Sequence, residues 1–538
     1  MNKIKIFFQR YRLPLGAAVL ALFLGHFFNR QIPSASTNFL WGDEAGNVFV
    51  WNQGILTPGF FAAARTHIMA PPLDHFMAGL WWKMLNTIAP AWCQAEMELA
   101  MRTYPMVMLA LGLAMLLVAA FVVSNSAGIV LLLAALLIGQ NSILAYIAVE
   151  LKFHASQFFF TSASWLAFVL SRRELEKETP SPFPFWLWLG VSSLGVWTHF
   201  FAAISTATQA MLLALFFYRA YRREGNLARF KRLRLGWLSA ILAFDAAALF
   251  AYAKFYANQP PLFVRANCKA FPDAAAEWNA ALTKLLPFLG IFWLAFALGL
   301  GAIKSLLRSK PDFPAAVSHF VMLGVCLATV ILPWFHSCKN YYWGPRYINF
   351  MFPLAFLCVA QALAWGLAMM KTSLAPWLQR SFVLAGLVLF ATLPPATGKP
   401  YIPGGDSFVQ LRRALQREQL QVKGVIGIQP SADRSLAVTD DGTWVGMTWE
   451  LYLKGPQGLP KILEFTDANK TGGFAMIASA ARENFPVIEA PAPGEEVYVD
   501  FSDPRHIVLR HPEAVPVSGM RPATSCGWIP IERRRSCH

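Results

Sequence analysis

Residues 104–123 read YPMVMLALGLAMLLVAAFVV, an unbroken run without one charged side chain. A helix needs about 20 mainly apolar residues to cross the hydrocarbon core of a bilayer, so this run predicts a membrane-spanning helix. The composition of the whole chain agrees with that interpretation. Its 538 residues are 56% hydrophobic and only 14% charged, with a mean hydropathy of +0.43, which excludes an ordinary soluble globular protein. The sequence therefore predicts a polytopic, mainly α-helical membrane protein.

The chain contains about 11 candidate spans of this length. Their approximate centres are Leu20, Leu113, Ala135, Ala163, Leu189, Leu212, Leu242, Trp293, Gly324, Leu357 and Leu387. The second and third candidates are separated only by the short polar gap Ser124–Ser126. The first candidate follows a basic N-terminus, as in a signal peptide. Because no small-residue cleavage site is evident near residues 28–31, we expect this helix to remain uncleaved.

The positions of Lys and Arg predict the orientation, since short basic loops stay in the cytoplasm. With the basic N-terminus inside, the basic loops at 172–173, 219–234, 304–310 and 371–380 all fall on the inner side. We therefore expect residues 1–396 to form a multi-pass domain and residues 397–538 to form an extracytoplasmic tail. The net charge of +16 then indicates topology and contact with anionic lipid, in preference to nucleic-acid binding.

The tail is polar and lacks long apolar runs, and its patterns predict a small α/β domain. A helical period covers residues 408–415, and a buried strand is expected at Gly424–Ile428. Further candidates are strands at Ser435–Val438, Val497–Phe501 and His506–Leu509 and a helix at Trp444–Leu453. Cys526 and Cys537 could form a disulfide in an oxidising compartment, and no cysteine pair has the spacing of a zinc site.

The first outer loop, about residues 29–102, is far longer than a simple connection, which indicates function. It contains the adjacent carboxylates Asp43 and Glu44. Ionised groups beside hydrocarbon are costly, so this pair indicates catalysis, ion passage or pairing. Farther on, Pro71-Pro72 predicts the start of a helix with Asp74 near its positive end. The aromatic and apolar surface of that helix suits the membrane interface.

The order of these features resembles the C-type glycosyltransferases that use polyprenyl-phosphate-linked sugars. It resembles more narrowly the bacterial branch related to protein O-mannosyltransferases and lipid A aminoarabinose transferases. Further motifs carry the resemblance in order from about Asn38 to Phe356: Asp43-Glu44-Ala45, Pro71-Pro72-Leu73, Val149-Glu150-Leu151-Lys152, Trp197-Thr198-His199-Phe200 and Pro345-Arg346-Tyr347. Two positions depart from the family pattern: Ala70 stands where a histidine is common, and Lys152 replaces an arginine.

The resemblance implies transfer of a sugar from a polyprenyl-phosphate donor to an acceptor hydroxyl, with inversion, on the outer face of a bacterial cytoplasmic membrane. It makes Asp43 the candidate general base. Glu44, the second catalytic candidate, is its neighbour, a substrate contact or a helix-orienting group, although one carboxylate could instead cap the following helix. The cations Arg346, Lys152 and Lys339 could stabilise the leaving phosphate. Snorkelling at the interface is the alternative for all three.

Four other residues at expected outer ends are candidate substrate contacts: Glu150, His75, His199 and Tyr347. Glu150 could also pair with Lys152 or hold a metal. Together with His154, His75 and His199 could bind a divalent cation, but their spacing is not that of a ligand set, so hydrogen-bonded histidines are expected and the metal stays unassigned.

Three rival functions are open at the level of sequence. A transporter would make Asp245, a carboxylate inside a span, central to its mechanism. A hydrolase of lipid-linked substrates is less favoured, because no Gly-Xaa-Ser-Xaa-Gly motif appears where a nucleophile would be needed. A nonenzymatic scaffold would leave the ordered motifs unexplained. The sequence identifies neither the sugar nor the acceptor, which could be a lipid, a polysaccharide or a protein.

Overall fold

A computed structural model describes parts of residues 1–396 and parts of the tail. The described residues are 21–37, 40, 44, 47–48, 51, 57, 71–140, 142–199, 201–224, 235–257, 349–350, 352–369, 375–392, 406–426, 464–466, 494–500, 508–511 and 520–521. The residues that the structure describes are mostly helical, as the composition predicts. Contacts divide it into two compact units. Unit 1 comprises Met1–Gln31, Pro105–Val149 and Phe153–Gly398, and unit 2 comprises Ile32–Tyr104, Glu150–Lys152 and Lys399–His538.

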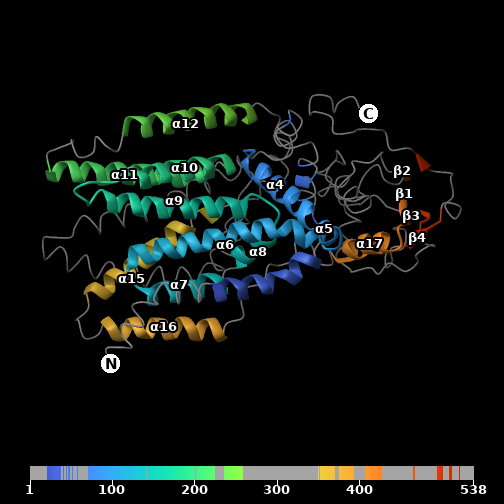
Figure 1. The fold of residues 1–538 in the computed structure, drawn as a ribbon, viewed down its shortest axis with the longest axis horizontal. Coiled ribbons are helices and arrows are strands. Elements are labelled where there is room, and N and C mark those ends of the chain that lie inside the picture. The colour runs from blue at the N-terminus through green and yellow to red at the C-terminus, as the bar shows by residue number, and fades with distance from the viewer. Residues whose placement is uncertain are drawn as a thin grey trace, which may run out of the picture. The chain divides into compact units, whose positions relative to one another are not determined.

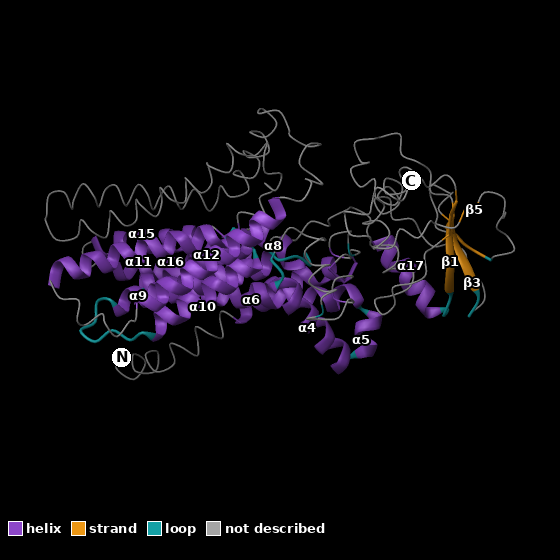
Figure 2. Cartoon of the chain, turned by 90° about the horizontal axis from the view of Figure 1, so that it is seen from above, coloured by secondary structure: helices purple, strands orange, loops and turns teal. Residues whose placement is uncertain are grey.

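Unit 1 is built from long helices that lie side by side (Figures 1 and 2). They are α6 (Met97–Ser124, which begins in unit 2), α7 (Ala127–Gln140), α8 (Ser142–Val149), α9 (His154–Glu174), α10 (Phe183–Thr198), α11 (Ala202–Glu224), α12 (Leu235–Ala257), α15 (Phe352–Met369) and α16 (Ala375–Thr392). Helix α9 packs against α10 and α11, and α7 packs against α15 and α16.

Eight of the expected span centres fall within these helices: Leu113, Ala135, Ala163, Leu189, Leu212, Leu242, Leu357 and Leu387. Among the described residues, α6 is the helix that is both long and apolar enough to cross a membrane. The count of about 11 spans stays a prediction, and the centres Leu20, Trp293 and Gly324 lie outside the described residues. The gap after Ser124 is a true break, because Asn125 adopts a left-handed conformation with φ 49° between α6 and α7.

A buried polar network joins three helices of unit 1. Gln209 on α11 accepts a hydrogen bond from Trp188 Nε1 on α10 at 2.6 Å, and its amide nitrogen donates to Ser164 Oγ on α9 at 3.0 Å. Polar side chains that bond across apolar helices help to fix which faces meet. This network therefore specifies the register among α9, α10 and α11.

Unit 2 contains two helices between residues 73 and 95 and the described parts of the tail. Its helices are α4 (Leu73–Ile88), α5 (Pro90–Ala95) and α17 (Asp406–Arg417), and its strands are β1 (Gln421–Ile426), β2 (Glu464–Thr466), β3 (Glu496–Asp500), β4 (Val508–Arg510) and β5 (Met520–Arg521). The strands form one sheet in the order β4-β3-β1-β2-β5, parallel at its centre and antiparallel at both edges.

The elements expected near residues 408–415, 424–428, 497–501 and 506–509 are confirmed as α17, β1, β3 and β4. The expected strand at 435–438 and helix at 444–453 lie outside the described residues, as do Cys526 and Cys537. Helix α17 ends in a Schellman turn, in which Gln419 has φ 57° and the Leu420 amide donates to the Leu415 carbonyl. This turn leads the chain directly from α17 into β1.

Glycines bring α7 and α16 into backbone contact. A Cβ added to Gly128 on α7 would lie 2.6 Å from the Gln379 carbonyl oxygen of α16, and one added to Gly386 on α16 would lie 3.0 Å from the backbone of Leu131. Small residues allow such close approach between apolar helices. Larger side chains at either position would force the two helices apart.

We predict that Gly128→Ala lowers stability by about 1–3 kcal/mol, the usual cost of overpacking. Thermal unfolding of the purified protein in detergent measures the effect. Gly190→Ala on α10 is the matched control, since a Cβ there meets nothing within 4 Å. Equal unfolding midpoints for the two variants would contradict the close α7–α16 contact.

Candidate active site

The centre of the candidate site is a buried ion pair between Glu44 and Arg102. Arg102 lies on α6 and donates from Nη2 to Glu44 Oε2 at 2.9 Å and from Nε to Oε1 at 3.3 Å. Both residues are only 2% exposed. Arg102 also donates from Nη1 to the Ala35 carbonyl at 3.0 Å, near the end of helical residues 21–37. One guanidinium thus joins the Asp43-Glu44 motif to the segment that precedes it.

The same carboxylate holds the segment 150–152. The Leu151 amide donates to Glu44 Oε1 at 2.7 Å, and the Leu151 carbonyl accepts from Asn47 Nδ2 at 2.5 Å. Glu44 and Asn47 are both helical and lie one turn apart, so they hold both polar groups of the Leu151 backbone. Two motifs that are more than 100 residues apart in sequence therefore form one site.

Lys152 brings a cation into this site. Its Nζ lies 3.5 Å from Glu150 Oε1, and both side chains are buried. The pairing of Glu150 with Lys152, one of the alternatives at the level of sequence, is the arrangement found. Because the backbone between them is held by Glu44, the position of the Lys152 ammonium depends on the Glu44 carboxylate.

Helix α4 contacts the turn of α6 that carries Arg102. Tyr104 Oη donates to Asp74 Oδ1 at 3.0 Å, and Trp81 Nε1 donates to Thr103 Oγ1 at 2.9 Å. Asp74 lies in the first turn of α4, as the Pro71-Pro72 pattern predicts, where the helix dipole favours a carboxylate. His75, the next residue, is buried on the same helix.

The exposed side of α4 carries an apolar stripe. Leu80, Met84 and Ile88 are exposed and recur every four residues, so they lie along one side of the helix. Trp92 on α5 is also exposed. Such a stripe next to a polar site is the surface expected of a helix at a membrane interface.

His199 belongs to unit 1 and is neutral. Its ring stacks on Phe153 with centroids 4.1 Å apart, and burial lowers the pKa of His199 to about 3. The Phe201 amide donates to Nδ1 at 3.3 Å, which places the imidazole proton on Nε2. His199, which follows the last residue of α10, therefore carries no positive charge at neutral pH.

The structure describes some of the predicted site residues and not others. Glu44, Glu150, Lys152 and His75 are in unit 2, and His199 is in unit 1. The candidates Asp43, Lys339, Arg346 and Tyr347 lie outside the described residues. Among the residues that are described, no three His, Cys, Asp or Glu side chains gather closely enough to hold a metal ion.

Arg102 and Tyr104 are residues of this site that sequence reasoning missed. Arg102 precedes the apolar run of α6 and Tyr104 is its first residue, and a charged or polar side chain at such a place is expected to be an interfacial anchor. The spacing of Glu98 and Arg102 also fits an ordinary pair within one helix. In the structure Glu98 instead binds Arg412, and Arg102 binds Glu44. Both partners are far away in sequence. The available signal was that both charges lie at the start of a strongly apolar helix.

No protein-family model matches the chain, and no curated protein sequence matches it significantly. Among solved structures, ArnT from Cupriavidus metallidurans matches in the apo state with a TM-score of 0.41 and 12% identity. The same protein bound to undecaprenyl phosphate matches with a TM-score of 0.40 and 14% identity. Each match covers 82% of this chain and 78% of the other.

The archaeal oligosaccharyltransferase AglB from Archaeoglobus fulgidus, in complex with an inhibitory peptide and a dolichol-phosphate, has a TM-score of 0.40 and 10% identity. That match covers 96% of this chain and 77% of AglB. ArnT and AglB are C-type glycosyltransferases, the class that the sequence motifs resemble.

We predict that Arg102→Lys destabilises the protein by about 2–3 kcal/mol, because an ammonium cannot replace the paired donors on Glu44 and the bond to Ala35 together. Arg413→Lys is the control, since its exposed pair with Glu96 should change stability by less than about 1 kcal/mol. Chemical unfolding of both variants in micelles compares them. A fully stable Arg102→Lys protein would mean that the bidentate geometry is unimportant.

Proposed function

We propose that this protein is a membrane glycosyltransferase that moves a sugar from a polyprenyl-phosphate donor to an acceptor hydroxyl. The observation that carries the proposal is the joint binding of Leu151 by Glu44 and Asn47. It unites the Asp43-Glu44 motif and the Glu150–Lys152 motif in one polar site. A carboxylate and a cation are the two groups that this transfer requires.

In the proposed reaction Asp43 removes the proton from the acceptor hydroxyl, whose oxygen attacks the anomeric carbon. The bond from that carbon to the phosphate oxygen breaks, and the lipid phosphate leaves with the electron pair. A single displacement of this kind inverts the anomeric centre. Glu44 has a different role, because Arg102 and the Leu151 amide occupy both of its oxygens. We assign Glu44 as the residue that positions its neighbour Asp43.

Lys152 is the proposed contact for the leaving phosphate. An ammonium has three N–H donors, so Lys152 can hold Glu150 and a phosphate oxygen at the same time. Arg346 and Lys339 are proposed as further phosphate contacts from the sequence alone. His75, His199 and Tyr347 are proposed, from the sequence alone, to bind the sugar or the acceptor.

The apolar stripe of α4 supports a lipid-linked donor. A polyprenyl chain stays in the bilayer, so the enzyme must bring its polar site to the membrane surface. Leu80, Met84 and Ile88 are exposed on the helix that carries Asp74 and His75, which suits contact with lipid beside the site. We place the site on the outer face of a bacterial cytoplasmic membrane, with the N-terminus inside and the tail outside.

The test is transfer of labelled sugar from a polyprenyl-phosphate donor by membranes that contain the protein. Asp43→Asn should lower the transfer rate by on the order of 10²–10⁴-fold, since it removes the base and keeps the shape. Asp245→Asn is the control. It removes a carboxylate from α12, outside the proposed site, and should leave transfer unchanged.

Two outcomes would contradict the proposal. Transfer by Asp43→Asn at the wild-type rate would remove Asp43 from the mechanism. Labelled substrate that accumulates inside vesicles without transfer, and only when Asp245 is intact, would identify a transporter instead.

A further inference from the structure

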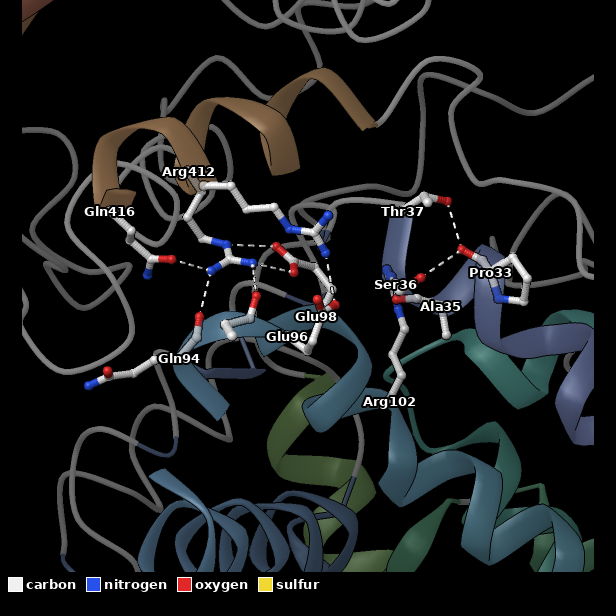
Figure 3. Close-up of polar contacts among 12 residues, drawn as sticks. Pro33, Ala35, Ser36, Thr37, Gln94, Glu96, Glu98, Arg102, Arg412 and Gln416 are labelled. Atoms are coloured by element: carbon white, nitrogen blue, oxygen red, sulfur yellow. Dashed lines mark hydrogen bonds and ion pairs between the residues drawn. The ribbon is translucent and has the colours of Figure 1, made fainter. Parts of the chain in front are cut away.

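Arg412, on tail helix α17, uses all five of its N–H groups. It donates from Nε to Glu98 Oε1 at 3.0 Å and from Nη2 to Glu98 Oε2 at 2.8 Å. Its other donors reach the carbonyls of Gln94 at 2.7 Å and Ala95 at 3.2 Å and the Gln416 side chain at 2.8 Å (Figure 3). Only an arginine has enough donors for this arrangement.

These contacts are made in the interior. Arg412 is 1% exposed and Glu98 is 0% exposed, so neither charge has water as an alternative partner. The carbonyls of Gln94 and Ala95 end α5 and have no partner within that helix. The single Arg412 side chain thus neutralises a buried carboxylate on α6 and also caps the C-terminal end of α5. The tail helix is in this way part of the folded structure of the first outer loop.

Arg412 binds α6 one turn before the residue that binds the Asp43-Glu44 motif. Glu98, which binds Arg412, precedes Arg102 by one helical turn, and Arg102 binds Glu44. Arg102 and Arg412 make the same two kinds of contact: each pairs with a carboxylate and donates to a carbonyl near the C-terminal end of a helix. Any shift of the α6 start therefore moves the guanidinium that fixes Glu44.

We infer that Arg412 is a positioning residue for the transfer reaction, through which the extracytoplasmic tail sets the geometry of the outer-loop site. Its effect runs from Arg412 to Glu98, along one turn of α6 to Arg102, and from there to Glu44 and Leu151. The statement that this geometry serves transfer rests on the proposed function. The mechanical link from the tail to Glu44 does not depend on it.

The neighbouring residue offers a matched control. Arg413 pairs with Glu96 at 2.8 Å, yet the side chains are 44% and 35% exposed. Arg412→Gln and Arg413→Gln remove the same charge from adjacent positions of one helix. An exposed pair contributes little, whereas loss of one partner of a buried pair leaves a charge without compensation. Only the first variant should disturb the α6 start.

The experiment measures hydrogen exchange and transfer kinetics on the full-length protein in detergent or liposomes. In Arg412→Gln, exchange of peptides that cover residues 44–48 and 150–152 should rise about tenfold or more, because their hydrogen bonds open more often. Its kcat should fall on the order of 10- to 100-fold at a donor KM close to wild type, as expected for a misplaced base. Arg413→Gln should change neither quantity more than about twofold.

Arg412→Lys serves if Arg412→Gln does not fold. It keeps a charge opposite Glu98 but cannot also serve the two carbonyls, so we expect an intermediate rise in exchange and an intermediate loss of kcat. The inference is overturned if either folded Arg412 variant matches Arg413→Gln in both measurements. Raised exchange in a protein whose wild type transfers no sugar would support the link from tail to site and reject the proposed function.

Discussion

Charged side chains in the interior of unit 2 must be paired, and two such side chains lie one turn apart on α6. Glu98 and Arg102 lie at the start of α6 and are almost completely buried. Breaking such a pair by loss of one partner costs about 3–5 kcal/mol. Each of the two residues is paired with a partner far away in sequence: Glu98 with Arg412, and Arg102 with Glu44. The pairs determine which segments meet at α6.

The polar site follows from that choice of partners. Because Glu44 is fixed on one side by Arg102, its other contact can hold the Leu151 amide, which brings Lys152 close to the Asp43-Glu44 motif. Helix α4 joins through Asp74 and Tyr104 and presents an apolar stripe beside the site. In the proposed function, the start of α6 thus holds in position both Glu44, the neighbour of the base, and the segment 150–152 that carries the phosphate contact.

Much of this architecture could be predicted from local pattern. The apolar runs predict the described helices of unit 1, the Pro71-Pro72 pattern predicts α4, and the periodicity of residues 408–415 predicts α17. The partners of Glu98 and Arg102 could not be predicted, because an i, i+4 spacing fits an intrahelical pair equally well. Arg412 was hidden for a related reason. An arginine in an amphipathic tail helix is normally expected in water, and only the tertiary structure reveals a buried carboxylate opposite it.

The central claim is that the buried Glu44–Arg102 pair organises the candidate site in unit 2, and a double-mutant cycle tests it most directly. The measurement is the free energy of unfolding of wild type, Glu44→Leu, Arg102→Leu and the double variant in mixed micelles. Each single substitution leaves a buried charge without its partner, while the double substitution leaves none. We predict that the double variant is more stable than either single variant. Two independent losses that simply add would contradict the account.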